Sequence, residues 1–144
     1  MSDTYVQIQL DTALLSEAEL NDYAKMVELV THGISPTMLF NFGRTLGLSG
    51  QGTADLVSMS KSTLDRRNSA NKLLTLEESE RVLRFMRLYA KAFQLFKTNE
   101  ATIKWFSTVN KALGDKKPIE YARTEPGARL VEDILGRIKE GVFS

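Results

Sequence analysis

The chain contains no cysteine and only one histidine among its 144 residues. The absence of cysteine excludes disulfides, thiol nucleophiles and cysteine-ligated metals, and it fits a reducing compartment. The histidine, His32, stands at an expected helix end, where an imidazole complements the helix dipole more simply than it binds metal or transfers protons. Since no pairing of a base with a nucleophile is evident either, we expect no enzymatic activity, no metal site and no cofactor.

Long apolar runs are also missing. No stretch approaches the roughly 18 apolar residues that cross a bilayer, and the first ten residues, MSDTYVQIQL, lack the basic segment and apolar run of an export signal. We therefore expect no membrane association and a cytoplasmic protein. The composition, 42% hydrophobic and 26% charged, is typical of a globular protein, and the length suffices for one substantial core or two small ones.

The chain has little net charge, but its charge is unevenly distributed. Residues 1–30 contain six carboxylates and one lysine, a net charge of −5, so the remaining residues must carry +6 to give the total of +1. An acidic N-terminal segment therefore precedes a basic body. The positive excess suits a polyanionic partner, although an ordinary solvated surface explains it nearly as well.

The chain is organised around residues 50–67, GQGTADLVSMSKSTLDRR, which we interpret as a helix, a tight turn and a second helix. Ala54 is small enough for a close helix crossing, Ser58 is a small residue at the corner, and Leu64 supplies an apolar anchor. This spacing predicts a helix-turn-helix, whose helices cross steeply and exclude bulky residues from the crossing. The same residue types also occur by chance in helical proteins, and Ser58 replaces the glycine usually preferred at the turn.

The second of these helices presents polar side chains that can contact phosphates and base edges of DNA. We expect its cations to bind DNA and its hydroxyls to assist, whereas its carboxylate is repelled by phosphate unless it accepts from cytosine or turns inward. One monomer offers few phosphate contacts, so we expect a homodimer on two half-sites about one helical turn apart. The candidate DNA-binding residues are Lys61, Ser62, Thr63, Asp65, Arg66 and Arg67.

The segments before this motif predict two further helices. Residues 1–15 could form a short strand, an arm laid on a partner or a loose end, and we take a flexible arm as the default. A first helix is expected over residues 16–31, with Ser16 and Glu19 spaced as a capping box. Ser35 is the expected N-cap of a second helix that closes at Gly47.

The second half of the chain predicts several more helices. Thr75 and Glu78 form a capping box that opens the longest one, about residues 76–97, whose aromatic stripe we expect to build a second small core. Asn99 is the expected cap of a short helix, and a last helix should follow Thr124. All of these elements are helical.

An ordered set of residues in this half resembles a known family, the toxin-binding domain of Xre/MbcA/ParS-type antitoxins. The similarity covers about residues 76–142 and extends back over the helix-turn-helix, which precedes this domain at the same distance in that family. The acidic N-terminal extension and Ser58 depart from the family's pattern. The matching residues are the segment LEESERVLRFMR from Leu76 to Arg87, then Ala92, Phe96, Ala101, Trp105, Phe106, Asn110, Leu113, Gly114, Pro118, Thr124, Gly127, Ala128, Val131, Leu135, Ile138 and Gly141.

The resemblance implies an all-α fold, with an Xre/Cro-like helix-turn-helix domain for DNA binding and dimerisation at residues 16–73. A small helical toxin-binding domain would follow at residues 74–144. It further implies a bacterial type II antitoxin without catalysis of its own, whose partner is a RES-domain toxin that degrades NAD. The antitoxin would block entry of NAD to the toxin's active site and bind the operator of its own operon as a dimer.

Blocking an enzyme cleft calls for a protruding segment, and on this resemblance we expect it at the C-terminal edge of the chain. Cationic side chains there could occupy a site shaped for the pyrophosphate of NAD. The alternative is that Phe143 folds back on its own core and Arg137 is merely solvated. For the whole chain, the alternative is a stand-alone Xre-type regulator that binds an operator and has no protein partner. The candidate toxin-binding residues are Arg129, Arg137, Lys139, Glu140, Gly141, Val142 and Phe143.

Overall fold

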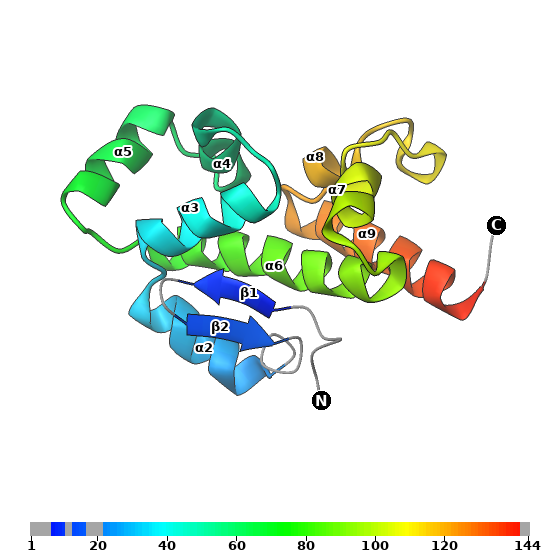
Figure 1. The fold of residues 1–144 in the computed structure, drawn as a ribbon, viewed down its shortest axis with the longest axis horizontal. Coiled ribbons are helices and arrows are strands. Elements are labelled where there is room, and N and C mark those ends of the chain that lie inside the picture. The colour runs from blue at the N-terminus through cyan, green and yellow to red at the C-terminus, as the bar shows by residue number, and fades with distance from the viewer. Residues whose placement is uncertain (1–6, 11–12, 17–21, 142–144) are drawn as a thin grey trace. The chain divides into compact units, whose positions relative to one another are not determined.

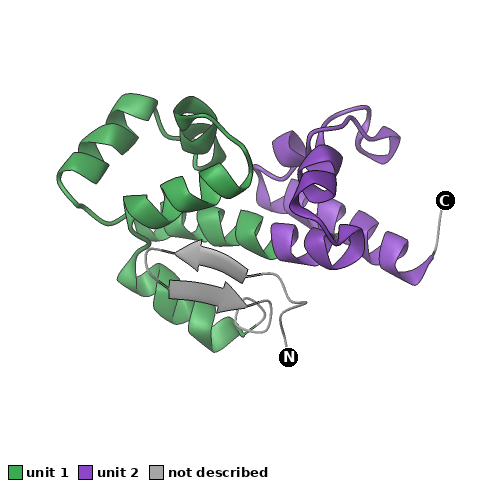
Figure 2. Ribbon diagram, viewed as in Figure 1, with its two compact units in different colours: residues 1–87 green, residues 88–144 purple. Residues whose placement is uncertain are grey.

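The computed structural model describes the backbone of residues 7–10, 13–16 and 22–141, and the side chains of residues 22–141 (Figure 1). The chain divides into two compact units, unit 1 (Met1–Arg87) and unit 2 (Leu88–Ser144) (Figure 2). The division falls inside the longest helix, α6 (Leu76–Phe96), whereas the sequence suggested a boundary before that helix, at residue 74. Unit 1 therefore includes the first three turns of α6.

Unit 1 begins with an antiparallel hairpin of β1 (Gln7–Leu10) and β2 (Ala13–Ser16), in which Gln7 pairs with Ser16. Strand β1 lies against α3 (Figure 1). The strand alternative for this segment is therefore the one observed, in place of the flexible arm that we took as the default. Ser16 lies in β2, so the expected helix start at this residue is wrong, and its proposed capping partner Glu19 lies outside the described residues.

Four short helices follow, and each begins at a polar residue whose side chain accepts a hydrogen bond from the helix N-terminus. Such caps satisfy amide groups that have no partner inside the helix. Asp22 takes the role expected of Ser16, whereas Ser35 caps the second helix as predicted. The helices are α2 (Tyr23–His32), α3 (Pro36–Thr45), α4 (Gly50–Leu56) and α5 (Lys61–Ser69), with the N-caps Asp22, Ser35, Ser49 and Ser60.

The core of unit 1 is built on a very close approach of α3 to α4. A Cβ added to Gly43 would lie 2.1 Å from Oγ1 of Thr53, so only glycine fits at this point. Thr53 is buried, and its hydroxyl donates to the carbonyl of Ser49, which leaves no buried polar group without a partner there. Phe42 and Leu64 are fully buried beside this crossing.

Helix α6 begins with the predicted capping box. The amide of Glu78 donates to the Thr75 hydroxyl (3.2 Å), and the Thr75 amide donates to the Glu78 carboxylate (2.9 Å). The predicted apolar stripe is buried at Val82, Phe85, Met86 and Tyr89, whereas Phe93 and Phe96 are only partly buried. None of the helices described between residues 22 and 141 has the length and apolar character needed to cross a membrane.

Unit 2 contains the rest of α6 and a set of shorter helices around one core. Thr98, not Asn99, caps the next helix, because the Asn99 side chain instead accepts a hydrogen bond from the Tyr89 hydroxyl. Thr124 caps the last helix, and Gly141 ends it in the left-handed conformation, as expected. The elements are α7 (Asn99–Phe106), the 3₁₀ turn η1 (Lys111–Leu113), α8 (Pro118–Tyr121) and α9 (Glu125–Glu140).

The described part of the chain is thus all-α apart from one two-stranded hairpin, and the predicted fold class is confirmed. Helix α9 buries Val131, Ile134 and Leu135 in the core of unit 2. Its first turn approaches the preceding helix closely, because a Cβ on Gly127 would lie 1.8 Å from the carbonyl oxygen of Tyr121.

Candidate functional site

The connection between α4 and α5 has the geometry of a helix-turn-helix. Ala54 and Leu64, the small residue and the apolar anchor of the predicted motif, are both fully buried. Ser58 has a φ of 54°, so the turn passes through the left-handed region at this residue. That conformation explains the usual preference for glycine at the corner, since a Cβ makes it unfavourable. Ser58 adopts it nevertheless, and the turn is complete.

Helix α5 starts from a compact group of hydroxyls. The Ser60 hydroxyl accepts from the Thr63 amide (3.1 Å) and donates to the Thr63 hydroxyl (2.8 Å), while the Ser62 hydroxyl lies 3.3 Å away. Thr63 is partly buried by this arrangement, whereas Ser62 remains exposed. Leu64 is the one buried residue of the helix, so most of α5 is presented outward.

Lys61 and Asp65 form an ion pair across one helical turn of α5. The Lys61 ammonium lies 2.8 Å from the Asp65 carboxylate, and both side chains are about half exposed, at 51% and 49%. The carboxylate that appeared unfavourable toward phosphate is therefore neutralised by its neighbour. An exposed pair of this spacing is worth only a few tenths of a kcal/mol, so a phosphate could displace Asp65 at little cost.

The two arginines of α5 lie in different environments. Arg66 is exposed, and within residues 22–141 no side chain forms an ion pair with it. Arg67 is only 21% exposed and forms an ion pair with Glu78 of α6. Arg66 is thus presented to solvent, whereas Arg67 is engaged inside unit 1.

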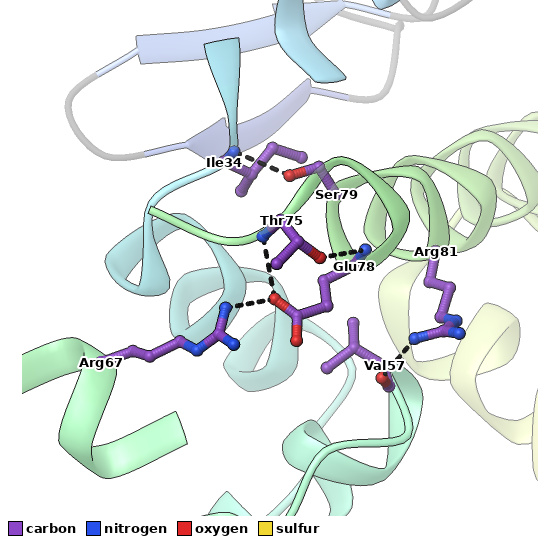
Figure 3. A network of polar contacts seen from close by, with 7 residues as sticks. All are labelled: Ile34, Val57, Arg67, Thr75, Glu78, Ser79 and Arg81. Carbon is purple, nitrogen blue, oxygen red and sulfur yellow. Dashed lines mark hydrogen bonds and ion pairs between the residues drawn. The ribbon is translucent and has the colours of Figure 1, made fainter. Parts of the chain in front are cut away.

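Figure 3 shows the polar network behind α5. The Glu78 carboxylate lies between the Arg67 guanidinium and the Thr75 amide, and Arg81, one turn further along α6, donates to the carbonyl of Val57 in the turn (3.0 Å). The capping-box pattern in the sequence predicts the pairing of Glu78 with Thr75 but not its ion pair with Arg67. The spacing of Glu77 and Arg81 favours an ion pair along α6, but no local pattern could find the bond from Arg81 to Val57, which is 24 residues away.

Ser79 lies on a different face of α6 from Glu78 and Arg81 and is directed toward Ile34 (Figure 3). Its buried hydroxyl accepts from the amide of Ile34 (3.0 Å). The amide of Leu74 in turn donates to the Ile34 carbonyl (2.9 Å). These two bonds attach the α2–α3 connection to the start of α6. Together with the bonds of Glu78 and Arg81, they connect the start of α6 to three other parts of unit 1.

The residues expected to bind a toxin lie on α9 and just beyond it, with Arg129 near the start of the helix and the others at its C-terminal end. Arg129 pairs with Glu125 (3.2 Å) on the solvent side, and both are well exposed. Leu130, which the sequence analysis did not single out, is 46% exposed although it is apolar. Its position outside the buried stripe of α9 was the signal that could have found it. Arg137, Lys139, Glu140 and Gly141 are exposed, whereas Val142 and Phe143 lie outside the described residues.

Comparison with known proteins assigns both halves of the chain. Residues 25–87 match the Antitoxin Xre-like helix-turn-helix domain, and residues 91–141 match the Antitoxin Xre/MbcA/ParS C-terminal toxin-binding domain. The boundary between the two matches lies close to the division between unit 1 and unit 2.

Three curated relatives are similar to the chain. An "Antitoxin Xre" from Yersinia enterocolitica is 42% identical over 83 residues, 57% of this chain and 56% of the relative. An "Antitoxin Xre" from Photorhabdus laumondii is 34% identical over 80 residues, 55% of this chain and 54% of the relative. A "Prs ADP-ribosylating antitoxin" from Sphingobium is 24% identical over 127 residues, 82% of this chain and 80% of the relative.

The chain thus spans little more than half the length of the first two relatives. The two domain matches nevertheless agree with the two structural units and with the resemblance found in the sequence. On residues 25–87 and 91–141, this chain belongs to the Xre/MbcA/ParS-type antitoxins, as an Xre-like helix-turn-helix domain followed by a C-terminal toxin-binding domain.

Proposed function

We propose that this protein is the antitoxin of a bacterial type II toxin–antitoxin system and that its partner is a RES-domain toxin that degrades NAD. Unit 2 would bind the toxin and obstruct its active site, and unit 1 would bind the operator of the shared operon. The observation that carries this proposal is the succession of the two matched antitoxin domains. The proposal assigns no reaction to the chain itself, and it implies the cytoplasm, where operator DNA lies.

The exposed surface of α5 supports DNA binding. Arg66 and Lys61 are exposed cations on one short helix, and the hydroxyl of Ser62 stands beside them. Such groups contact phosphates and base edges when a helix enters the major groove. We assign the principal DNA contacts to these three residues, with Thr63, Asp65 and Arg67 supporting them from the same helix. A homodimer would place two copies of α5 on a palindromic site.

The exposed face of α9 supports toxin binding. Leu130 offers apolar area to a partner, and Arg129 and Arg137 flank it with charges that an enzyme's anion site could receive. Arginine is enriched in protein interfaces, and the exposed apolar area of Leu130 would be removed from water by a partner. The chain beyond Lys139 would complete this surface.

The name of the Sphingobium relative supports the choice of toxin. That name couples an antitoxin with ADP-ribosylation, a reaction that consumes NAD. A RES-domain partner, which the sequence resemblance implies, would act on the same dinucleotide. The chemical target of the toxin is thereby proposed as NAD, with the antitoxin acting only by occupying space.

Coexpression with the product of the adjacent gene tests the proposal. We expect the two proteins to copurify, and cellular NAD, measured enzymatically, to fall when the neighbour is expressed alone but not when both are expressed. In cells that express both proteins, Leu130→Glu should allow NAD to fall again, because the antitoxin no longer binds. Lys72→Glu, at an exposed position in unit 1, should keep NAD at its normal level. Copurification without any effect on NAD would contradict the RES-type assignment.

The second candidate is a stand-alone Xre-type regulator, favoured by the complete helix-turn-helix and its exposed cations. It predicts operator binding that weakens steeply with salt, because each neutralised phosphate releases a counterion. It also predicts no protein partner. Gel filtration of the purified chain with and without the neighbouring gene product separates the two candidates.

A further inference from the structure

Helix α5 has few attachments of its own to unit 1. One of its side chains, Leu64, is buried, and the helix contacts α3 and α4 around that single anchor. A short helix held at one point can change its tilt without losing much buried area. Reading base edges, however, requires side chains to be held within about 0.5 Å and 10–20° of the productive geometry. Something else must therefore set the direction of α5.

Two residues of α6 hold the two ends of this region. Glu78 binds Arg67 near the C-terminal end of α5, and Arg81 binds the carbonyl of Val57 in the turn before α5 (Figure 3). Residues three apart lie on one face of a helix, so a single face of α6 makes both attachments. Glu78 is itself fixed by the Thr75 amide and is only 14% exposed, which makes it a rigid support.

We infer, on the basis of the proposed binding of DNA by α5, that Glu78 and Arg81 are positioning residues that set the tilt of α5. Through this tilt they would determine how well the protein discriminates operator from random DNA. Neither side chain needs to touch DNA. Arg67 then acts mainly as the attachment of α5 to α6, and Arg66 as the group that reads the duplex. The inference separates two properties, because general attraction to DNA depends on net charge while discrimination depends on geometry.

The test uses the full-length chain and two duplexes of equal length. One is the sequence that the wild type selects from a randomised pool, and the other is a scrambled sequence. Glu78→Gln should weaken binding to the selected duplex about tenfold, on the order of 1.4 kcal/mol. Its affinity for the scrambled duplex should stay the same or increase. The slope of log affinity against log salt concentration should become steeper by about one, because Arg67 is released as a free cation.

The matched control is Glu80→Gln, an exposed position on the same helix with the same change of charge. It should alter binding to both duplexes by the same factor. A fold that is merely destabilised by Glu78→Gln would also lower both affinities together, in step with its melting temperature. Equal changes on the two duplexes, or identical behaviour of the Glu78 and Glu80 variants, would overturn the inference.

Arg81→Met provides a second test at the other attachment, and it decides the matter if Glu78→Gln does not fold. Lys72→Met, exposed in unit 1, removes the same charge and serves as its control. Arg81→Met should lose discrimination, and Lys72→Met should keep it. If the wild type selects no sequence, the DNA-binding function fails. If it selects one and all variants discriminate equally, only the positioning role fails.

Discussion

At the scale of single residues, the corner of the helix-turn-helix carries a measurable strain. Ser58 is held at a φ of 54°, where a residue with a Cβ is disfavoured by about 1–2 kcal/mol. Glycine removes that cost, although it also gains entropy in the unfolded chain. We expect Ser58→Gly to stabilise unit 1 by about 0.5–1 kcal/mol, seen as a melting temperature a few degrees higher.

The matched comparison is Ser58→Ala, which keeps the Cβ and should give no gain. Because Ser58 is exposed, neither change disturbs the core. A lower melting temperature for the glycine variant would show that the serine side chain stabilises the turn by more than its backbone conformation costs.

Tyr89 gives unit 2 a dependence on alkaline pH. Its side chain is 3% exposed and donates to the Asn99 side chain, and burial raises the pKa of the Tyr89 hydroxyl from 10 to about 12. The folded state therefore keeps this proton after the unfolded state has released it. The contribution of this group to the free energy of unfolding is complete below pH 10. It is lost between pH 10 and 12, at up to about 1.4 kcal/mol per pH unit.

Tyr89→Phe should remove this part of the pH dependence, because it has no proton to lose. Denaturant unfolding followed at pH 9, 10 and 11 measures the effect as a shallower slope of unfolding free energy against pH. Tyr121→Phe leaves Tyr89 in place and should retain the wild-type slope. Equal slopes for Tyr89→Phe and the wild type would contradict the assignment.

At the scale of elements, α9 contains two glycines with opposite roles. A Cβ on Gly127 would meet the carbonyl of Tyr121 at 1.8 Å, whereas a Cβ on Gly136 would meet no atom within 4 Å. Gly127→Ala should therefore push α9 away from α8 and cost about 1–3 kcal/mol. Gly136→Ala should stabilise the helix by up to about 1 kcal/mol, since alanine is the better helix former.

The two variants make the same chemical change in one helix, so each is the control for the other. Thermal unfolding followed by circular dichroism distinguishes them by the sign of the shift. If Gly136→Ala also weakens binding to the toxin, the methyl group lies in the interface. Destabilisation by both alanines would show that space at Gly136 is limited by something other than residues 22–141.

At the scale of the whole molecule, two units with separate cores predict separable functions. Arg66→Ala should reduce DNA binding, because an exposed cation is lost, while leaving toxin inhibition and the melting temperature unchanged. Arg67→Ala should also lower the melting temperature, because it leaves the partly buried Glu78 without its cation. Electrophoretic mobility shift, NAD consumption by the proposed toxin and thermal unfolding measure the three properties.

Truncation after Lys139 is the corresponding change in unit 2. It should weaken inhibition of the toxin and spare DNA binding, since Glu140 and the residues after it are removed while the buried stripe of α9 remains. Normal inhibition by the truncated chain would remove this end from the toxin-binding surface. Loss of both functions in either variant would mean that the two surfaces depend on each other.

The sequence alone determined the helical class, the two antitoxin domains and most helix starts. Caps such as Ser35 and Thr124 and the box of Thr75 with Glu78 act over three or four residues, so their signals are local. The same reasoning failed for the first helix. Ser16 and Glu19 have the right spacing, but pairing of Ser16 with Gln7 in the hairpin places it in a strand.

Only the tertiary structure decided which side chains of α5 are available to a partner. Arg66 and Arg67 are identical in chemistry and adjacent in sequence, yet one is exposed and the other is engaged by Glu78, 11 residues further along the chain. The approach of Gly43 to Thr53 was likewise invisible in the sequence. The physical reason is that burial and ion pairing depend on residues brought together by folding, whereas caps and helical periodicity depend on neighbours in the chain.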